Sequence, residues 1–286
     1  MPSILAPSSD PDTVVLLPGD RSGAEDCDAL VAWHRAHGGV TLLLDGTEWT
    51  GLAAIDRPLI ARLPPVDEWS LSHLHHLAPS GAIRFDPASR PRTLFLDRDG
   101  TIMEDRDYLA DPEGVVLLPG AAAGLRMLQA AGIRLVLVSN QSGVGSGRIP
   151  PGALERVHAR LLDLLRREDV TLDGAYYCVQ RTDAGCDCRK PRPGLIHRAV
   201  AELGVPLTPA AVVGDKPADI GLARSVGATA FLVTTGYGAA TRRDGTTQAD
   251  FVVDSLRTLA RICLDPRGLP VEAPLPSVPP LLPDSP

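Results

Sequence analysis

The sequence predicts an α/β protein whose larger part is a doubly wound parallel sheet, preceded by a small α/β domain. From about residue 92, short apolar runs alternate with segments of helix length, which is typical of parallel strands with helices on both faces. The stretch Pro-Ala-Ser-Arg-Pro at 87–91 precedes this alternation and indicates a linker. The length of 286 residues, of which 44% are apolar, allows two modest domains with proper cores.

The first part of the chain is less regular. Residues 1–12 are rich in Pro, Ser and Asp, and we expect them to be disordered. The small domain over 13–86 is predicted to contain strands at 13–17 and 40–44 and helices at 24–37, 57–63 and 68–77. The helix at 24–37 ends before Gly38-Gly39, a composition that suits a helix C-terminus.

The second domain is expected over 92–264 and is followed by a Pro-rich flexible tail at 265–286. The segment 151–168 has Leu154, Val157 and Leu161 at helical spacing, which predicts an amphipathic helix. Applied along the domain, the same reasoning predicts strands at 93–97, 133–138, 175–179, 211–214, 228–233 and 251–253, and helices at 121–131, 151–168, 193–203, 218–226 and 255–264.

Polar clusters follow three of these strands. Asp97 and Asp99 are two residues apart, so in an extended segment they point the same way, and Gly100 allows a sharp turn after them. Ser139-Asn140-Gln141 and Gly214-Asp215-Lys216 follow two other strands. The carboxyl ends of parallel strands share one edge of the sheet, so the clusters are expected to converge.

The combined chemistry of these clusters suits phosphoryl transfer. The carboxylates are ligands for a hard cation such as Mg²⁺, and the hydroxyl and amide groups can bind an oxyanion. Arg189 and Lys190 add positive charge. Positioning and charge neutralisation provide most of the catalysis in such reactions.

The five cysteines include a cluster formed by Cys178, Cys186 and Cys188. In a reducing compartment this spacing indicates a metal site before it indicates disulfides. The net charge of −7, with no basic block, argues against nucleic acid or an anionic membrane as main partner. The sequence has no apolar stretch of spanning length and no signal pattern, so we expect a cytoplasmic protein.

Five motifs in order resemble a known enzyme family. LFLDRDGTI, VSNQSGVGSG, YYC, CDCRKPRPG and VVGDKPADI look like the motifs of haloacid dehalogenase-superfamily phosphatases. They most resemble the branch with histidinol phosphatases and D-glycero-D-manno-heptose 1,7-bisphosphate phosphatases, over about 92–262. The resemblance implies a Rossmann-like, haloacid-dehalogenase-like fold, and the sequence shows no large cap insertion. It also implies a Mg²⁺-dependent hydrolase of a phosphorylated sugar.

The resemblance assigns roles to individual residues. Asp97 would be the nucleophile that forms an aspartyl-phosphate, and Asp99 the general acid and base. Mg²⁺ would bind Asp97, the backbone carbonyl of Asp99, and Asp215, with Lys216 and Asp219 as supporting groups. Ser139 and Lys190 would bind the transferring phosphoryl group. The expected substrate contacts are Arg98, Asp105, Tyr108, Asn140, Gln141, Ser142 and Arg189.

The cysteine cluster differs from the pattern of the branch, which commonly holds a structural zinc ion with three cysteines and a histidine. Cys178, Cys186 and Cys188 match, but Gln180 stands where the histidine is expected. An amide oxygen is a poor zinc ligand beside an imidazole. Zinc would then bind through three thiolates plus water or another side chain, or the loop has lost the metal; we favour bound zinc.

Residues 13–85 resemble, over GDRSGAEDCDALVAWHRAHGGVTLLL, the middle of a sugar-1-phosphate nucleotidyltransferase. The Gly-rich phosphate-binding loop that such enzymes need at their start is absent, so we expect a truncated piece without that activity. A nucleotidyltransferase-like piece in the same chain as a phosphatase-like domain favours a sugar phosphate as the substrate of the second domain. Heptose phosphatases and sugar nucleotidyltransferases serve successive steps of one pathway.

Three alternatives remain. A histidinol-phosphate phosphatase would use the same site on an amino-alcohol phosphate. A non-catalytic protein could bind a phosphometabolite or a partner on the same fold, although an intact aspartate pair offers a pure binder no advantage. A polynucleotide 3′-phosphatase is disfavoured by the negative charge and the lack of a basic stripe.

Overall fold

The computed structural model describes residues 2–7, 13–18, 24–37, 40–45, 48–56, 59, 81–245, 248–266 and 268–273. The chain divides into two compact units, one formed by Met1–Ser89 with Arg267–Pro286 and the other by Arg90–Pro266. No described helix is both long and apolar enough to cross a membrane.

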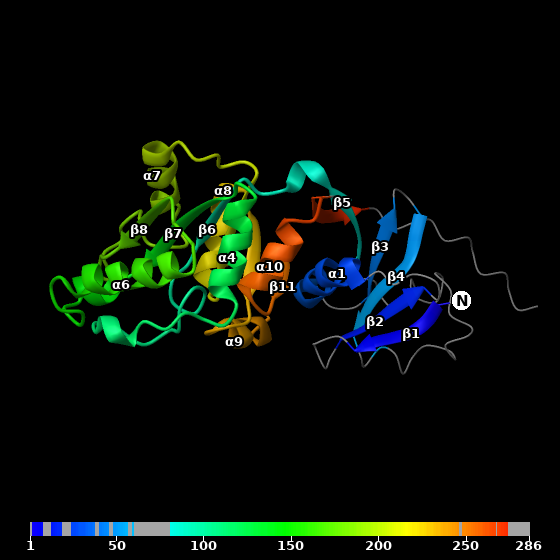
Figure 1. The fold of residues 1–286 in the computed structure, drawn as a ribbon, viewed down its shortest axis with the longest axis horizontal. Coiled ribbons are helices and arrows are strands. Elements are labelled where there is room, and N and C mark those ends of the chain that lie inside the picture. Colours follow the sequence, from blue (N-terminus) through cyan, green and yellow to red (C-terminus); the bar gives the residue numbers. More distant parts are fainter. Residues whose placement is uncertain are drawn as a thin grey trace, which may run out of the picture. The chain divides into compact units, whose positions relative to one another are not determined.

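The second unit contains a six-stranded sheet with the order β11-β10-β9-β6-β7-β8, of which Figure 1 labels β6, β7, β8 and β11. All neighbouring strands are parallel, which confirms the predicted fold class. The strands are β6 (Thr93–Leu96), β7 (Arg134–Asn140), β8 (Gly174–Cys178), β9 (Ala210–Gly214), β10 (Thr229–Val233) and β11 (Phe251–Val253).

The central strands are short apolar runs because both of their faces are covered. Every residue of β6 and of β9 is buried, and neither strand alternates between apolar and polar residues. Such continuous apolar strands are expected in parallel sheets with helices on both sides. Because β6 and β9 are parallel neighbours, their carboxyl ends lie next to each other, and these ends lead into Asp97 and Asp215.

Helices connect the strands near the predicted positions. They are α4 (Ala121–Ala130), α6 (Ala153–Arg167), α7 (Gly194–Leu203), α8 (Pro217–Val226) and α10 (Leu256–Cys263). With right-handed crossovers, α4 and α6 cover one face of the sheet, and α7 and α8 cover the other. Helix α10 packs against α4, as Figure 1 shows. The sequence did not predict the short elements η3 (Pro112–Gly114), α5 (Ser142–Gly145) and α9 (Gly238–Arg243).

The first unit contains a mixed sheet with the order β1-β2-β4-β3-β5-β12, in which only β3 and β5 are parallel neighbours. Its elements are β1 (Pro2–Pro7), β2 (Thr13–Pro18), α1 (Ala24–His37), β3 (Val40–Asp45), β4 (Glu48–Asp56), β5 (Gly81–Asp86) and β12 (Leu269–Ala273). The helices predicted at 57–63 and 68–77 lie outside the described residues, apart from residue 59.

Two expected irregular segments contain strands instead. The predicted disordered N-terminus includes β1, whose backbone groups find partners in antiparallel pairing with β2. The predicted flexible tail includes β12, which pairs with β5. Because β12 is an edge strand, Pro270, which has no N–H, is tolerated there. The Pro content of a segment therefore excludes a central strand but not an edge strand.

The predicted linker also has structure. Residues Pro87–Ser89 form a single 3-10 turn, η2. The Ser89 hydroxyl donates to the Leu269 carbonyl oxygen and accepts from the Leu269 N–H, both at 2.9 Å. These bonds join the start of the linker to β12 within the first unit. The resemblance of this unit to part of a nucleotidyltransferase stays a prediction.

Candidate active site

The site lies where the order of strand connections reverses. From β6 the chain continues to β7 and β8 on one side, and then returns to β9 and β10 on the other side. Such a switch point leaves a crevice at the carboxyl ends of the flanking strands, which is where open α/β sheets bind ligands. Asp97 follows β6, and Asp215 follows β9, so the two carboxylates flank the crevice.

A buried ion network occupies the floor of this crevice. Lys190 Nζ lies 2.7 Å from Asp97 Oδ1 and 2.6 Å from Asp219 Oδ1. The ammonium also donates to the Val138 carbonyl oxygen at 3.0 Å. No side chain of the three is more than 6% exposed. Asp219, which lies in the first turn of α8, is therefore a buried partner of Lys190 and not an exposed helix carboxylate.

The network fixes the charge of the predicted nucleophile. Burial is the largest single influence and raises the pKa of Asp97, but the charge and hydrogen bond of the Lys190 ammonium, together with the charge of Lys216, outweigh burial and leave the pKa below its usual value. Burial alone would lower the pKa of Lys190, whereas the carboxylates of Asp219 and Asp97 raise it. Asp97 is therefore an anion at neutral pH, as a nucleophilic carboxylate must be.

Asp215 is fully buried, and one of its oxygens lacks a partner. Its Oδ2 accepts from the Tyr237 N–H at 2.8 Å. Its Oδ1 accepts no hydrogen bond from any residue that the structure describes, and Lys216 Nζ is 4.0 Å away. Burial, followed by repulsion from Asp97, raises the pKa of Asp215 to about 7.

These carboxylates fit a divalent cation. One oxygen each from Asp97, Asp215 and Asp219 lie within 4.8 Å of one another. A buried carboxylate oxygen without a donor is costly, and Mg²⁺ with its preference for oxygen ligands would relieve that cost. The donor set around Asp215 Oδ1 therefore suits the predicted metal.

Gly100 makes this arrangement possible. Its φ of +78° lies in the left-handed region, and a Cβ there would be 2.1 Å from Asp215 Oδ2. The chain after β6 must therefore turn sharply and pass directly against the Asp215 carboxylate, which no larger residue allows. The glycine that directly follows Asp97 and Asp99 in the sequence is therefore required for a steric reason.

Asp99 is held beside the crevice by two neighbours. Arg98 donates to its two oxygens at 3.0 and 2.9 Å, and Gln141 Nε2 donates to Oδ2 at 2.7 Å. Burial raises the pKa of Asp99 and outweighs the opposing attraction of the Arg98 guanidinium. A carboxyl group with a raised pKa can retain a proton for the leaving oxygen, which suits the predicted general acid.

Arg98 is both a predicted substrate contact and a support for Asp99. The residue is 1% exposed and forms the bidentate pair with Asp99, and the substrate contact stays a prediction. Its guanidinium carbon lies 5.9 Å from the ring centroid of Tyr177, whose hydroxyl is 2.8 Å from His158 Nδ1. Arg98 therefore positions Asp99 from the protein interior.

The residues at the end of β7 also serve as supports. Ser139 Oγ accepts from Gln141 Nε2 at 3.1 Å. The Asn140 amide donates to the Lys190 carbonyl oxygen at 3.2 Å and accepts from the Lys190 N–H at 3.0 Å. Asn140 thus fixes the backbone that carries the buried ammonium, a role that its sequence position did not indicate.

A pocket of about 240 Å³ opens next to Asp99. Six of the predicted substrate contacts line it, and Arg189 does not. The predicted lining residues are Arg98, Asp105, Tyr108, Asn140, Gln141 and Ser142, and the remaining ones are Asp99, Arg106, Asp107, Leu109, Gly143, Lys216 and Tyr237. Lys216 Nζ lies 2.7 Å from Asp105 Oδ2, which joins the loop after β6 to the loop after β9.

The segment after β10 supports the site and was missed by the sequence analysis. Thr235 donates to the Gly100 carbonyl oxygen at 2.6 Å, and Thr241 donates to the Asp215 carbonyl oxygen at 2.8 Å. Tyr237 supplies the N–H that binds Asp215. A signal existed, because Thr234-Thr235-Gly236 follows another strand whose carboxyl end lies at the same edge of the sheet.

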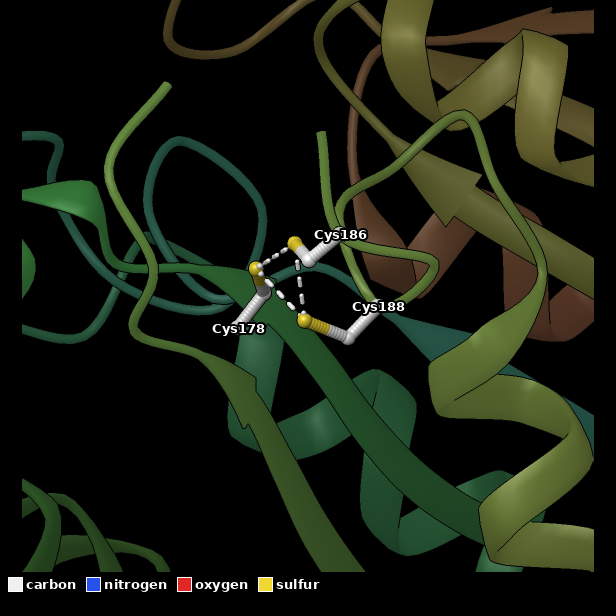
Figure 2. Close-up of side chains that lie close together, drawn as sticks. All are labelled: Cys178, Cys186 and Cys188. Carbon is white, nitrogen blue, oxygen red and sulfur yellow. Dashed lines mark hydrogen bonds between the residues drawn. The ribbon is translucent and has the colours of Figure 1, made fainter. Parts of the chain in front are cut away.

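The three clustered cysteines converge, as Figure 2 shows. Cys188 Sγ lies 3.0 Å from both Cys178 Sγ and Cys186 Sγ, and the latter two are 3.4 Å apart. Cys178 ends β8, and the other two lie in the loop before Lys190. Among the described residues, no histidine, aspartate or glutamate joins the cluster. Three thiolates are suitable donors for zinc, and no His, Cys, Asp or Glu of the described residues supplies a fourth.

Comparisons with known proteins agree with this geometry. A family model described as HAD-hydrolase-like matches residues 187–259. The D-glycero-beta-D-manno-heptose-1,7-bisphosphate 7-phosphatase of Pseudomonas putida is 38% identical over 171 residues, covering 59% of this chain and 98% of that protein. The protein with the same description from Escherichia coli K12 is 35% identical over 175 residues, covering 58% and 90%.

Solved structures show the same likeness. D,D-heptose 1,7-bisphosphate phosphatase from B. bronchiseptica, complexed with magnesium and phosphate, has a TM-score of 0.56 and 30% identity, covering 59% of this chain and 96% of that chain. A putative haloacid-dehalogenase-like phosphatase from Mesorhizobium loti has a TM-score of 0.51 and 31% identity, covering 63% and 88%. The chain therefore spans most of the length of each of these proteins.

Proposed function

The chain belongs to the D-glycero-β-D-manno-heptose-1,7-bisphosphate 7-phosphatase family of haloacid-dehalogenase-like hydrolases, and we propose that it removes the 7-phosphate from such a heptose bisphosphate. The chief support is the deprotonated Asp97 carboxylate, which lies buried beside Lys190 at the switch point of the sheet. An anionic carboxylate next to a fixed cation can attack a phosphoryl group whose negative charge would otherwise repel it.

The reaction proceeds in two steps. Asp97 attacks phosphorus, a new O–P bond forms, and the bond from phosphorus to the sugar oxygen breaks. Asp99 gives its proton to that oxygen, so the dephosphorylated sugar leaves as an alcohol. Asp99 then takes a proton from water, which attacks the phosphorus of the aspartyl-phosphate. This second displacement releases inorganic phosphate and restores the Asp97 carboxylate.

The surrounding residues prepare both steps. Lys190 Nζ, 2.7 Å from Asp97, would offset the negative charge at the attacking carboxylate, and Asn140 and Asp219 fix its backbone and its ammonium. The Gln141 amide donates to both Ser139 and Asp99. It therefore fixes the position of the proposed phosphoryl-binding hydroxyl of Ser139 relative to the proton-donating carboxyl group of Asp99. Mg²⁺ bound by Asp97, Asp215 and the backbone carbonyl of Asp99 would add positive charge against the phosphoryl oxygens. The magnesium in the B. bronchiseptica relative supports this assignment.

We also propose a structural zinc ion on Cys178, Cys186 and Cys188, with its fourth position open to water. The short Sγ separations support it. The ion would fix the loop that leads to Lys190. It would also fix the end of β8, where the Cys178 carbonyl oxygen accepts from the Gln141 N–H at 2.7 Å.

The test measures phosphate release with Mg²⁺ from both anomers of the heptose 1,7-bisphosphate and from L-histidinol phosphate. We expect a strong preference for the bisphosphate. Asp97→Asn should reduce the rate by a factor on the order of 10⁴ or more, as loss of a catalytic nucleophile does, and circular dichroism should show an intact fold. A preference for histidinol phosphate would contradict the proposed substrate. A rate that is unchanged by Asp97→Asn would refute the covalent mechanism.

A further inference from the structure

The cations that line the pocket already have carboxylate partners. Arg98 pairs with Asp99, and Lys216 pairs with Asp105. Arg106 Nη2 lies 2.9 Å from Glu104 Oε2. A substrate with two phosphates brings a second dianion that does not react, and this group needs a cation that is not already neutralised. None of these lining cations meets that need.

Arg148 contacts the pocket residue Tyr108 and has no carboxylate partner among the described residues. Its Nη1 donates to the Tyr108 hydroxyl at 2.7 Å, and its guanidinium carbon lies 4.7 Å from the centre of that ring. No carboxylate lies within ion-pair distance of it among the residues that the structure describes. Arg148 is exposed, and Tyr108 lines the pocket, so the guanidinium stands beside the opening and can turn its free N–H groups towards an anion.

The position of Tyr108 is specified by unusual local structure. Its φ of 53° lies in the left-handed region, which a bulky residue rarely adopts. A Cβ on Gly143 would lie 2.5 Å from Tyr108 Cδ1, so the ring packs directly on the glycine backbone. Strained backbone of this kind persists where the surroundings fix it, and it concentrates at functional sites. The Tyr108 ring is thus a rigid support for Arg148.

We propose that Arg148, held on Tyr108, is a specificity-determining residue that binds the phosphate of the bisphosphate that is not transferred. This inference rests on the proposed function. A guanidinium binds phosphate through two parallel N–H···O bonds, and these are stronger than the bond that Arg148 makes to a neutral phenol. The phenol hydroxyl and the ring keep the guanidinium in place before the substrate arrives, which reduces the entropy lost on binding.

The test compares variants on two substrates, the heptose 1,7-bisphosphate and the same heptose carrying only the 7-phosphate. Arg148→Gln should reduce kcat/KM for the bisphosphate about 10- to 100-fold, the loss typical of a charged hydrogen bond. The loss should appear mainly in KM, and kcat/KM for the monophosphate should stay within about twofold. Arg148→Lys should lose less, because it keeps the charge without the bidentate geometry.

Arg156→Gln is the matched control. Arg156 is an exposed arginine in α6 that does not line the pocket, so its loss makes the same change in net charge. We expect it to leave both substrates unaffected. Equal losses of Arg148→Gln on both substrates, or none on the bisphosphate, would overturn the role of Arg148 while the substrate assignment stands. A wild-type protein that shows no preference for the bisphosphate would instead overturn the proposed substrate, and the role of Arg148 with it.

Discussion

Replacing Lys190 with methionine tests the buried ion network most directly. The substitution keeps a long side chain of similar volume and removes only the ammonium. Asp97 and Asp219, which lie 2.7 and 2.6 Å from Nζ, then face each other without a cation between them. Both carboxylates are almost completely buried, so water cannot replace the lost charge.

The expected cost follows from burial. Removing one member of a buried ion pair typically costs about 3–5 kcal/mol, because the remaining charge is left uncompensated. We expect Lys190→Met to lower the free energy of unfolding of the second unit by this amount at neutral pH. Without Lys190 the folded-state pKa values of the two carboxyls lie above their unfolded values. The penalty is therefore present above the unfolded pKa, near 4, and should shrink as the pH falls towards it.

Urea unfolding followed by far-UV circular dichroism measures this change. All three tryptophans precede residue 90, so their fluorescence reports the first unit and serves as an internal reference. Arg198→Met is the matched control. The Arg198–Glu202 pair has the same 2.7 Å separation, but its side chains are 63% and 50% exposed, so Arg198→Met should lower the free energy of unfolding far less than Lys190→Met.

A double variant separates charge from packing. Adding Asp219→Asn to Lys190→Met removes one of the two buried carboxylate charges that lack a cation. The new amide keeps an oxygen that can accept from the Lys216 N–H. The double variant should be more stable than Lys190→Met by at least about 1 kcal/mol, the coupling expected of residues in one network. If the second substitution lowers stability further, or if Lys190→Met is as stable as the unaltered protein, the network does not have the energetic role described above.

Three further predictions concern the metal-binding residues. Asp215 must lose its proton to bind Mg²⁺, and burial raises its pKa to about 7. The Mg²⁺ affinity measured by calorimetry should therefore fall about tenfold per pH unit below pH 7, and a pH-independent affinity would contradict the assignment. Because folding raises this pKa from 3.8, the metal-free protein should also lose stability as the pH rises from that value through about 7. Gln180→His should raise the zinc content of the purified protein, measured by elemental analysis, whereas Thr182→His, at an exposed position of the same loop, should not; full occupancy in the unaltered protein would argue against the open fourth position.

The strand-end reasoning identified the centre of the site because the parallel sheet leaves little freedom. Once β6, β7 and β9 are parallel neighbours, their carboxyl ends lie at one edge, and Asp97, Ser139 and Asp215 follow from their places in the sequence. The same reasoning could have been extended to Thr235, because β10 also ends at this edge, but Tyr237 binds Asp215 only through its backbone N–H. Backbone donors leave no residue signature in a sequence.

The sequence alone determined the α/β class, the order of the strands and helices in the second unit, and the residue types gathered at the sheet edge, since periodicity and strand ends are local properties of the chain. Only the tertiary structure decided what each group contacts. It turned Arg98 inward to Asp99 and Asn140 towards the Lys190 backbone, placed Asp219 on the ammonium, and left Arg148 on Tyr108 without a carboxylate partner among the described residues. These pairings join residues that are mostly far apart in the chain, and burial decides their strength, so their roles depend on three-dimensional packing that no local pattern encodes.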